Sequence, residues 1–370
     1  MTIDNGFQLK RLSDIISLIK IPFFIFIVFI HNTNTTTVIP DVIIGPGTNV
    51  SLYYYTSQYI SEVVSRIAVP GFFLISGYLF FLNTDFDKNN YISKLKKRVK
   101  TLLVPYLFWN LLFICYYFIL PIFAPSLFQE EGHEITLKNI LCSLWVTRDG
   151  HAINQFWYVR DLMVCTIFSP LFYYLFRGNR MVKMVGIITL FLVWFFGLEI
   201  PVIGPYGFSS DALFFFGMGA LLGMNSITFT SYIKTPFWVI VAFVLSIADL
   251  LACDVNIHPL IHNLYIITGL IASFYLVGLY VDKKQNVSKN LMFLSSASFF
   301  VYAVHLPWII IPLRKGLYRF LNPSDDMTLL LLYFVIVIVT VLLSLLLYYI
   351  MSRFLPRFTS VVTGGRLANK

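Results

Sequence analysis

Five ionisable side chains interrupt otherwise apolar stretches of the chain and are the first candidates for chemistry. They are His31, Arg66, Arg160, Asp161 and His305. An imidazole titrates near neutral pH and can move a proton, and a carboxylate beside it can orient the ring. A guanidinium can hold a developing oxyanion or a phosphate group. Placing an ionisable side chain in apolar surroundings costs free energy, so each of these residues is expected to have a function or an interaction partner.

The composition indicates a membrane protein. Of the 370 residues, 58% are hydrophobic and only 12% are charged, whereas soluble domains carry about 25% charged residues. The net charge of +9 does not indicate a nucleic-acid partner, because the basic residues gather at one side of the apolar runs. The first long apolar run lacks a small-residue motif behind it, so we expect no cleavable signal.

Ten stretches approach the ~20 mostly apolar residues that a membrane-spanning helix needs. We therefore expect an all-α integral membrane protein, a bundle of about ten transmembrane helices forming one domain over residues 1–370. Of the 27 Lys and Arg residues, 19 lie in cytoplasmic segments if the N-terminus is inside, five lie outside and three lie within spans. The positive-inside rule thus places both termini in the cytoplasm, with 1–11 as the N-terminal segment and 351–370 as the tail. The expected spans are 12–32, 62–82, 101–122, 156–176, 181–199, 209–224, 235–252, 260–280, 291–312 and 327–350.

With this orientation, the five ionisable residues fall in one band near the outer side, and Lys20 lies below His31. His31 lies eleven positions after Lys20, a rotation within about 20° of three full helical turns and a rise of about 16 Å along the axis. This geometry suits a long ligand with an anionic head in the cytosol and a reactive tip in the membrane, the shape of an acyl-coenzyme A. A lysine that extends to the inner headgroups explains the same spacing.

Five segments, taken in chain order, resemble the membrane-bound acyltransferase-3 family. The first has the family's basic residue, ten intervening residues and a histidine, with lysine where arginine is commoner. The second has the family's arginine and its Ser-Gly-Tyr ending. Many members carry a glutamate five residues after the fourth-span tryptophan; here that position is Leu162, next to Asp161, and no fused esterase-like domain is expected. The segments are KIPFFIFIVFIH (20–31), RIAVPGFFLISGYLF (66–80), KKRVKTLLVPY (96–106), QFWYVRDLMVCTIFSPLFYYL (155–175) and SFFVYAVHLPW (298–308).

The resemblance implies an O-acyltransferase of the bacterial inner membrane. It would move an acyl group, with acetyl the expected one, from cytosolic acyl-CoA to a hydroxyl of a cell-envelope glycan or lipid-linked sugar. His31 would take the proton of the hydroxyl, and Asp161 would orient that ring. Arg66 would hold the thioester oxygen or the acceptor, and His305 would donate a hydrogen bond to the same centre. No GxSxG motif is present, so direct transfer is preferred to a serine acyl-enzyme.

Further residues are assigned to the two substrates. Trp157 and Arg160 would bind the acceptor, with the tryptophan as a stacking surface for a sugar; His133 and His151, in the long expected outer loop, are also open to such a role. The Pro70–Gly71 pair in the second span predicts a kink. The residues expected to hold the acyl-CoA donor are Lys20, Ser76, Gly77, Tyr78, Lys97 and Arg98.

Simpler interpretations stay open for several of these positions. The basic run 94–100 is also a topology signal, and Ser76–Gly77 also suits close helix packing, as does the Gly219–Gly223 pair. His258 and His262 lie four residues apart, but Pro259 and the lack of further ligands argue against zinc, so no metal is expected.

The chief rival function is a transporter or exporter of a surface polysaccharide or its lipid-linked precursor. Buried Arg, Asp and His residues serve transport pathways as well as catalysis. We find no inverted sequence repeat of the kind that many transporters show. The sequence leaves open the identity of the acceptor and the oligomeric state.

Overall fold

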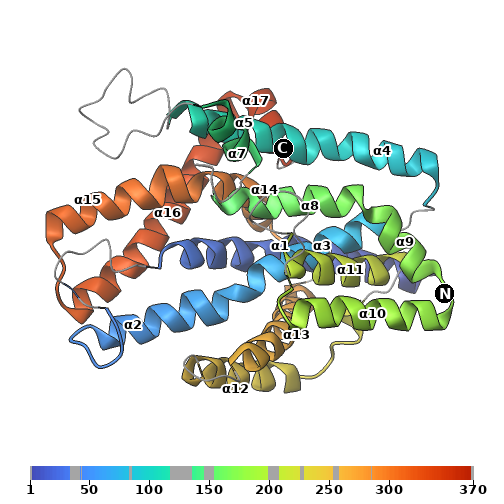
Figure 1. Cartoon of the computed structure of the whole chain (residues 1–370), viewed down its shortest axis with the longest axis horizontal. Helices are drawn as coiled ribbons and strands as arrows, with labels where there is room; N and C mark the ends of the chain where they lie inside the picture. The colour runs from blue at the N-terminus through green and yellow to red at the C-terminus, as the bar shows by residue number, and fades with distance from the viewer. Residues whose placement is uncertain are drawn as a thin grey trace. The chain divides into compact units, whose positions relative to one another are not determined.

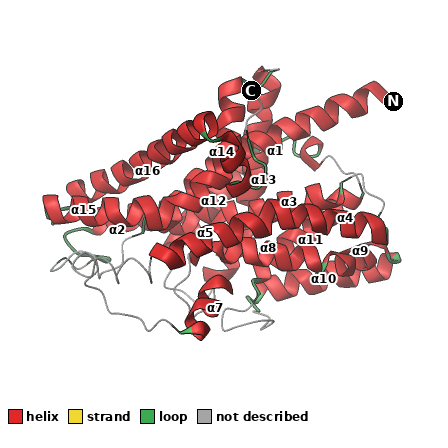
Figure 2. Ribbon diagram, turned by 90° about the horizontal axis from the view of Figure 1, so that it is seen from above, coloured by secondary structure: helices red, strands yellow, loops and turns green. Residues whose placement is uncertain are grey.

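The computed structural model describes residues 2–33, 42, 44–82, 86–116, 136–145, 154–198, 208–225, 229–252, 258–284 and 286–367. Within these residues every regular element is a helix (Figure 2), which confirms the prediction of an all-α protein. The chain divides into two compact units, each assembled from separate stretches of sequence. The helices of both units are labelled in Figure 1.

The first unit comprises residues 1–72, 227–353 and 368–370 and is organised around the N-terminal helix. Helix α1 (Thr2–His31) continues through Pro22 and packs against α13 (His258–Lys284) and α14 (Lys289–Val304). The apolar side chains at this junction are buried, which is the main source of stability for helices of this length. The other elements of the unit are α2 (Ser51–Ser57), η1 (Gln58–Val63), η2 (Val64–Ile67), η7 (Phe229–Ser231), α12 (Phe237–Leu251), η8 (His305–Ile310), α15 (Ile311–Leu321) and α16 (Asp326–Phe354).

The second unit comprises residues 73–226 and 354–367, so α3 (Ala68–Phe81) passes from one unit into the other. Within this unit α3 and α11 (Ser210–Met224) approach so closely that only glycine fits. A Cβ atom at Gly77 would collide with the carbonyl oxygen of Phe216, and one at Gly219 would collide with that of Leu74. The packing interpretation of both glycines is therefore confirmed. The other elements are α4 (Lys88–Arg98), η3 (Val99–Leu103), α5 (Val104–Ile114), α7 (Leu137–Trp145), η6 (Asn154–Phe156), α8 (Trp157–Ile167), α9 (Ser169–Arg177), α10 (Arg180–Phe195) and α17 (Pro356–Val362).

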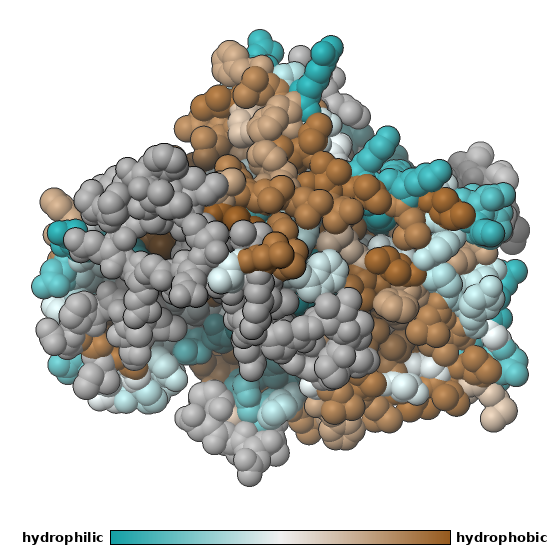
Figure 3. Space-filling model, turned by 45° about the horizontal axis from the view of Figure 1, so that its top comes forward, coloured by the Kyte–Doolittle hydropathy of each residue, from teal (hydrophilic) through white to brown (hydrophobic). Residues whose placement is uncertain are grey.

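Five stretches of described helix are long and apolar enough to cross a membrane, and α8 with α9, bent by 54°, would make a sixth. Helices α11 and α12 are apolar but shorter. Many large hydrophobic side chains are exposed, and Figure 3 shows them in brown over much of the described surface on that face. The structure thus supports a membrane protein, while the count of ten spans and the cytoplasmic termini stay predictions. The five stretches are Gly6–His31, Ser51–Phe81, His258–Lys284, Lys289–Leu321 and Asp326–Phe354.

Three of the expected site residues lie where the helix type changes. Arg66 lies in the 3₁₀ turn η2, Arg98 directly precedes the π-helical turn η3, and His305 begins the π-helical turn η8. A proline lacks the N–H that would bond to the carbonyl four residues earlier, so Pro70 frees the carbonyl of Arg66. The disturbance predicted at Pro70 therefore appears one to three turns earlier, over residues 58–67. Such π-helical turns are frequent at functional sites.

Candidate active site

The rings of His31 and His305 lie against each other in the first unit. His31 is the last residue of α1, and His305 opens η8. Their ring centroids are 5.1 Å apart, with an angle of 45° between the ring planes. His31 is half-buried, and His305 is fully buried. The structure therefore brings together two histidines that are 274 positions apart in the sequence.

The hydrogen bonds of His305 determine which of its nitrogens carries the proton. Nδ1 lies 2.8 Å from the carbonyl oxygen of Tyr302 and 3.1 Å from that of Val301. A carbonyl can only accept, so Nδ1–H is the donor, and Nε2 of the neutral ring is a lone-pair acceptor. Nε2 has no hydrogen-bond partner among the described residues. A neutral His305 consequently cannot donate through Nε2, contrary to the role expected for it.

Arg66 is held near this pair by an acidic residue that the sequence reading did not single out. Its Nε and Nη2 atoms donate to one carboxylate oxygen of Glu62, one helical turn earlier. The side chain of Arg66 is 42% exposed and is close enough to act electrostatically on the ring of His31. A guanidinium has five N–H donors, so Arg66 retains donors for a ligand. The spacing of four residues between Glu62 and Arg66 was the available sequence signal.

Buried hydrogen bonds hold the outer end of α1 in place. Ser61 Oγ donates to the carbonyl of Phe29 at 2.7 Å and lies 2.7 Å from the hydroxyl of Tyr333. The side-chain amide of Asn32 donates to the carbonyl of Tyr333 at 2.9 Å. Since these bonds join α1, η1 and α16, the position of His31 is restrained from two sides.

In the second unit, Arg160 and Asp161 form a closed ion pair. Arg160 donates from Nε and Nη2 to one carboxylate oxygen of Asp161, each at 2.8 Å, and both residues are buried. The other carboxylate oxygen accepts from the backbone N–H of Ser209 at 3.0 Å, at the start of α11. Asp161 thus caps a helix N-terminus, where a negative charge is stabilising. The catalytic role expected for Asp161 and the acceptor contact expected for Arg160 stay predictions, and either would compete with these bonds.

A basic cluster forms around Phe80 in the second unit. The ammonium group of Lys94 lies 4.8 Å from the centroid of the Phe80 ring and donates to the carbonyl of that residue, and the guanidinium of Arg98 lies 5.4 Å from the same centroid. Burial, helped by the charges of Arg98 and Lys97, lowers the pKa of Lys94 to about 8. Burial also lowers the pKa of Arg98. Lys97 is exposed and lies on the solvated face of the same helix.

Arg366 joins this cluster from the C-terminal tail, and the sequence reading missed it. Its Nη1 donates to the carbonyl of Thr363 at 2.6 Å and to that of Thr101 at 3.2 Å. The Thr101 carbonyl is free to accept because Pro105 lacks the N–H that would bond to it. Burial and the charge of Arg98 together lower the pKa of Arg366 to about 10. Two guanidinium groups this close to each other favour an anionic ligand.

The other residues expected to bind the acyl-CoA donor lie in different surroundings. Ser76 Oγ is 3.5 Å from the hydroxyl of Tyr158, a residue on which Arg98 and Arg366 both act electrostatically. Tyr78 is fully buried. The open side of Gly77 is filled by α11, so helix packing replaces the donor contact expected there.

The other placements follow from the helices that carry the residues. Lys20 lies on α1 of the first unit, half-buried. Trp157 is half-buried with its ring 6.2 Å from that of Phe73. His133 and His151 lie outside the described residues.

Comparisons with known proteins give two matches. The profile of a family described as "Acyltransferase domain", acyltransferase 3, matches residues 14–349. Over 126 residues the chain is 29% identical to the succinoglycan biosynthesis protein ExoH of Rhizobium meliloti (strain 1021), and this match spans 33% of each chain. No solved structure matches the chain. The family match runs through both units and ends before Arg366.

Proposed function

Because the chain belongs to the acyltransferase-3 family, we propose that it transfers an acetyl group from cytosolic acetyl-CoA to a hydroxyl of a cell-envelope polysaccharide or its lipid-linked precursor. The similarity to a protein of succinoglycan biosynthesis supports a polysaccharide acceptor. The membrane is the bacterial inner membrane, which the chain crosses ten times with both termini in the cytoplasm.

The observation that carries the mechanism is the His31–His305 pair. His31 is the general base, and it accepts the proton of the acceptor hydroxyl as the oxygen attacks the thioester carbon. Its other ring nitrogen then carries a proton that the lone pair of His305 Nε2 can accept. His305 thereby takes the orienting and charge-stabilising role that the sequence reading gave to Asp161.

The other charged residues complete the transfer. Arg66 donates to the oxyanion that forms at the thioester carbonyl, and Glu62 holds its guanidinium in position. When the tetrahedral centre collapses, the C–S bond breaks and the proton on His31 passes to the leaving thiolate of CoA. One ester bond forms as one thioester bond breaks, so no further reactant is needed.

The phosphates of the donor are bound by basic side chains. The cluster of Lys94, Arg98 and Arg366 supports this assignment, because Lys94 and Arg98 lie against the Phe80 ring and Arg366 interacts electrostatically with Arg98 and Tyr158. Lys97 adds positive charge on the same helix as Arg98, and Lys20 of the first unit is a further contact proposed for the donor. Arginine contacts a phosphate with two N–H groups at once, which makes Arg98 and Arg366 the stronger contacts.

The test uses the purified protein reconstituted in liposomes, with acetyl-CoA and oligosaccharides of the host envelope polysaccharide. Release of CoA that depends on the acceptor, with an acetyl ester on the product, is the expected result. If the glycan instead crosses the bilayer without acetyl-CoA and no CoA is released, the protein is a transporter and not an acyltransferase.

A further inference from the structure

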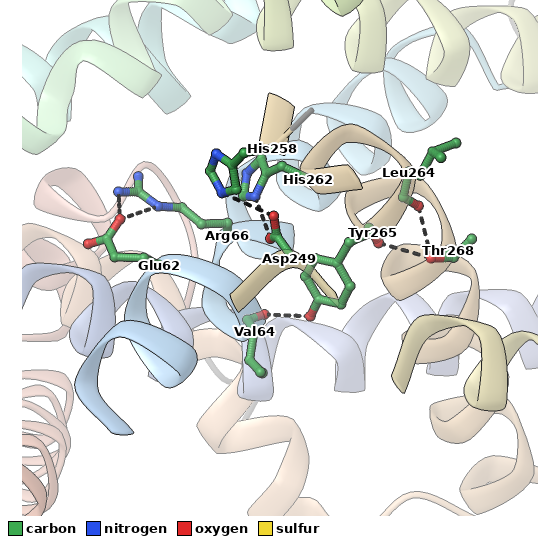
Figure 4. A network of polar contacts seen from close by, with 9 residues as sticks. All are labelled: Glu62, Val64, Arg66, Asp249, His258, His262, Leu264, Tyr265 and Thr268. Carbon is green, nitrogen blue, oxygen red and sulfur yellow. Dashed lines mark hydrogen bonds and ion pairs between the residues drawn. The ribbon is translucent and has the colours of Figure 1, made fainter. Parts of the chain in front are cut away.

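A second cluster of titratable side chains lies in the first unit, apart from the His31–His305 pair. It consists of Asp249 near the end of α12 and of His258 and His262 in the first turns of α13. Figure 4 shows both imidazoles on the same side of the Asp249 carboxylate. Residues four apart on a helix share a face, which is why His258 and His262 act together.

The geometry points to a site for one divalent transition-metal ion, and we propose that this ion is zinc. Three ligand atoms, Asp249 Oδ, His258 Nε2 and His262 Nδ1, all lie within 4.8 Å of one another. The Oδ2–Nδ1 distance to His262 is 2.7 Å, and the Oδ1–Nε2 distance to His258 is 3.1 Å. A zinc ion at ~2.1 Å from each ligand atom would hold them about 3.4 Å apart. Small outward rotations of the three side chains therefore admit the ion.

The second observation concerns the hydrogen bonds of the buried Asp249 carboxylate. Its side chain is completely buried, and a buried carboxylate oxygen is expected to have a hydrogen-bond donor. Oδ2 has one in His262, but Oδ1 has none among the described residues. His258 lies close to Oδ1 without the alignment of a hydrogen bond. One cation between the three groups would satisfy both oxygens and both imidazoles.

The donor set selects the class of metal. Two imidazoles and one carboxylate suit zinc and its neighbours in the first transition row, whereas magnesium and calcium prefer oxygen ligands. The side chains of His258 and His262 are 35% and 26% exposed, so an ion has a path of entry and room for a water as fourth ligand.

The neighbouring polar side chains have hydrogen-bond or ion-pair partners of their own (Figure 4). Arg66 is paired with Glu62. The hydroxyl of Tyr265 donates to the carbonyl of Val64 at 3.2 Å, and Thr268 donates to backbone carbonyls of its own helix. The ion would join α12 to α13, and α13 packs against both α1 and η2. The ion would thus stabilise the pair α12 and α13, which contacts the elements that carry His31 and Arg66.

The test uses the full-length protein in detergent. A chelator first removes any bound metal, Zn²⁺ is then added, and unbound zinc is removed by desalting. We expect about one zinc ion per chain by mass spectrometry of the metal, and Asp249→Asn and His262→Gln to weaken binding by more than ~100-fold. Asp325→Asn, which changes an exposed carboxylate outside the cluster, is the matched control and should bind like the wild type. Wild-type protein that retains no zinc, variants that bind as tightly as the wild type, or Mg²⁺ that displaces zinc at equal concentration would each overturn the proposal.

A measurement on the unaltered chain covers the case in which the variants fail to fold. Co²⁺ in place of zinc should give visible absorption bands, and X-ray absorption should show two imidazole nitrogens and oxygen ligands. The apparent melting temperature should rise with the free metal concentration, since a ligand that binds only the folded state stabilises it. A melting temperature that does not respond, with no Co²⁺ bands, would leave the cluster as an ion pair alone.

Discussion

The buried ring of His305 donates its Nδ1 proton to the carbonyl of Tyr302 at 2.8 Å and so presents a lone pair at Nε2, beside the ring of His31. This relationship separates the two histidines into different roles. In the proposed mechanism, His31 exchanges protons with the substrates, and His305 keeps His31 in the form that can accept one.

Replacing His305 tests that division. His305→Ala removes the acceptor for the second ring nitrogen of His31, so kcat should fall by about 10²-fold while KM for acetyl-CoA changes little. Steady-state kinetics of CoA release measure both. A rise in KM with an unchanged kcat would instead make His305 a residue of donor binding.

Arg98 and Arg366 should act together on the donor. Arg98→Ala or Arg366→Ala should raise KM for acetyl-CoA by about tenfold, because a hydrogen bond between charged groups contributes roughly 1.5–3 kcal/mol. Lys97→Ala, on the exposed face of the same helix, is the matched control and should have a smaller effect. If all three variants behave alike, general positive charge and not the buried cluster attracts the donor.

Donor binding should weaken as the pH rises through the pKa of Lys94. Burial lowers that pKa to about 8, so the side chain is charged below this pH and neutral above it. The dissociation constant for CoA, measured by calorimetry between pH 7 and pH 9, should therefore increase with pH. Lys94→Arg keeps its charge throughout this range and should abolish the increase; a wild-type curve that is flat would exclude Lys94 from the phosphate contacts.

The Arg160–Asp161 pair should matter for stability. Asp161→Asn leaves a buried guanidinium without its charged partner and weakens the cap of α11, which should cost about 3–5 kcal/mol. Thermal unfolding in detergent, followed by circular dichroism, measures the loss. The change Glu62→Gln, which removes a partly exposed pair, should lower the melting temperature far less. A stable Asp161→Asn protein with no acetyl transfer would favour the catalytic role first expected for Asp161.

The close approach of α3 and α11 gives a packing prediction. Gly219→Ala places a Cβ atom against the backbone of Leu74, where no side chain can move aside, so the folded yield should drop sharply. Gly316→Ala is the matched control, because nothing lies within 4 Å of a Cβ at that position. Equal yields of the two variants, measured by size-exclusion chromatography, would contradict the packing.

The features that could be predicted from the sequence are those that depend on composition or on a single helix. Hydropathy indicated an all-helical membrane protein, and the ionisable residues in apolar runs singled out His31, Arg66 and His305, which lie in the same unit. Gly219 was read as a helix-packing residue, and packing was the alternative to the donor contact expected for Gly77; the close approach of α3 and α11 at both positions agrees with packing, for which small residues are a local signature.

What the sequence could not predict depends on long-range geometry. The tautomer of His305 follows from the distances of its Nδ1 to the backbone carbonyls of Val301 and Tyr302, where α14 passes into the π-helical turn η8. No residue pattern announces such a turn. Arg366 reaches the basic cluster because Pro105 frees a carbonyl far away in the chain. Asp249 completes the histidine pair His258–His262 only because α12 and α13 fold back on each other.

The most direct test of the central claim is the transfer of an isotope-labelled acetyl group to the acceptor by reconstituted His31→Ala protein, measured in a single turnover. The account predicts a rate at least about 10²-fold below that of the wild type, with correct membrane insertion and unchanged binding of CoA. A rate close to that of the wild type would show that His31 does not take the proton and would contradict the mechanism.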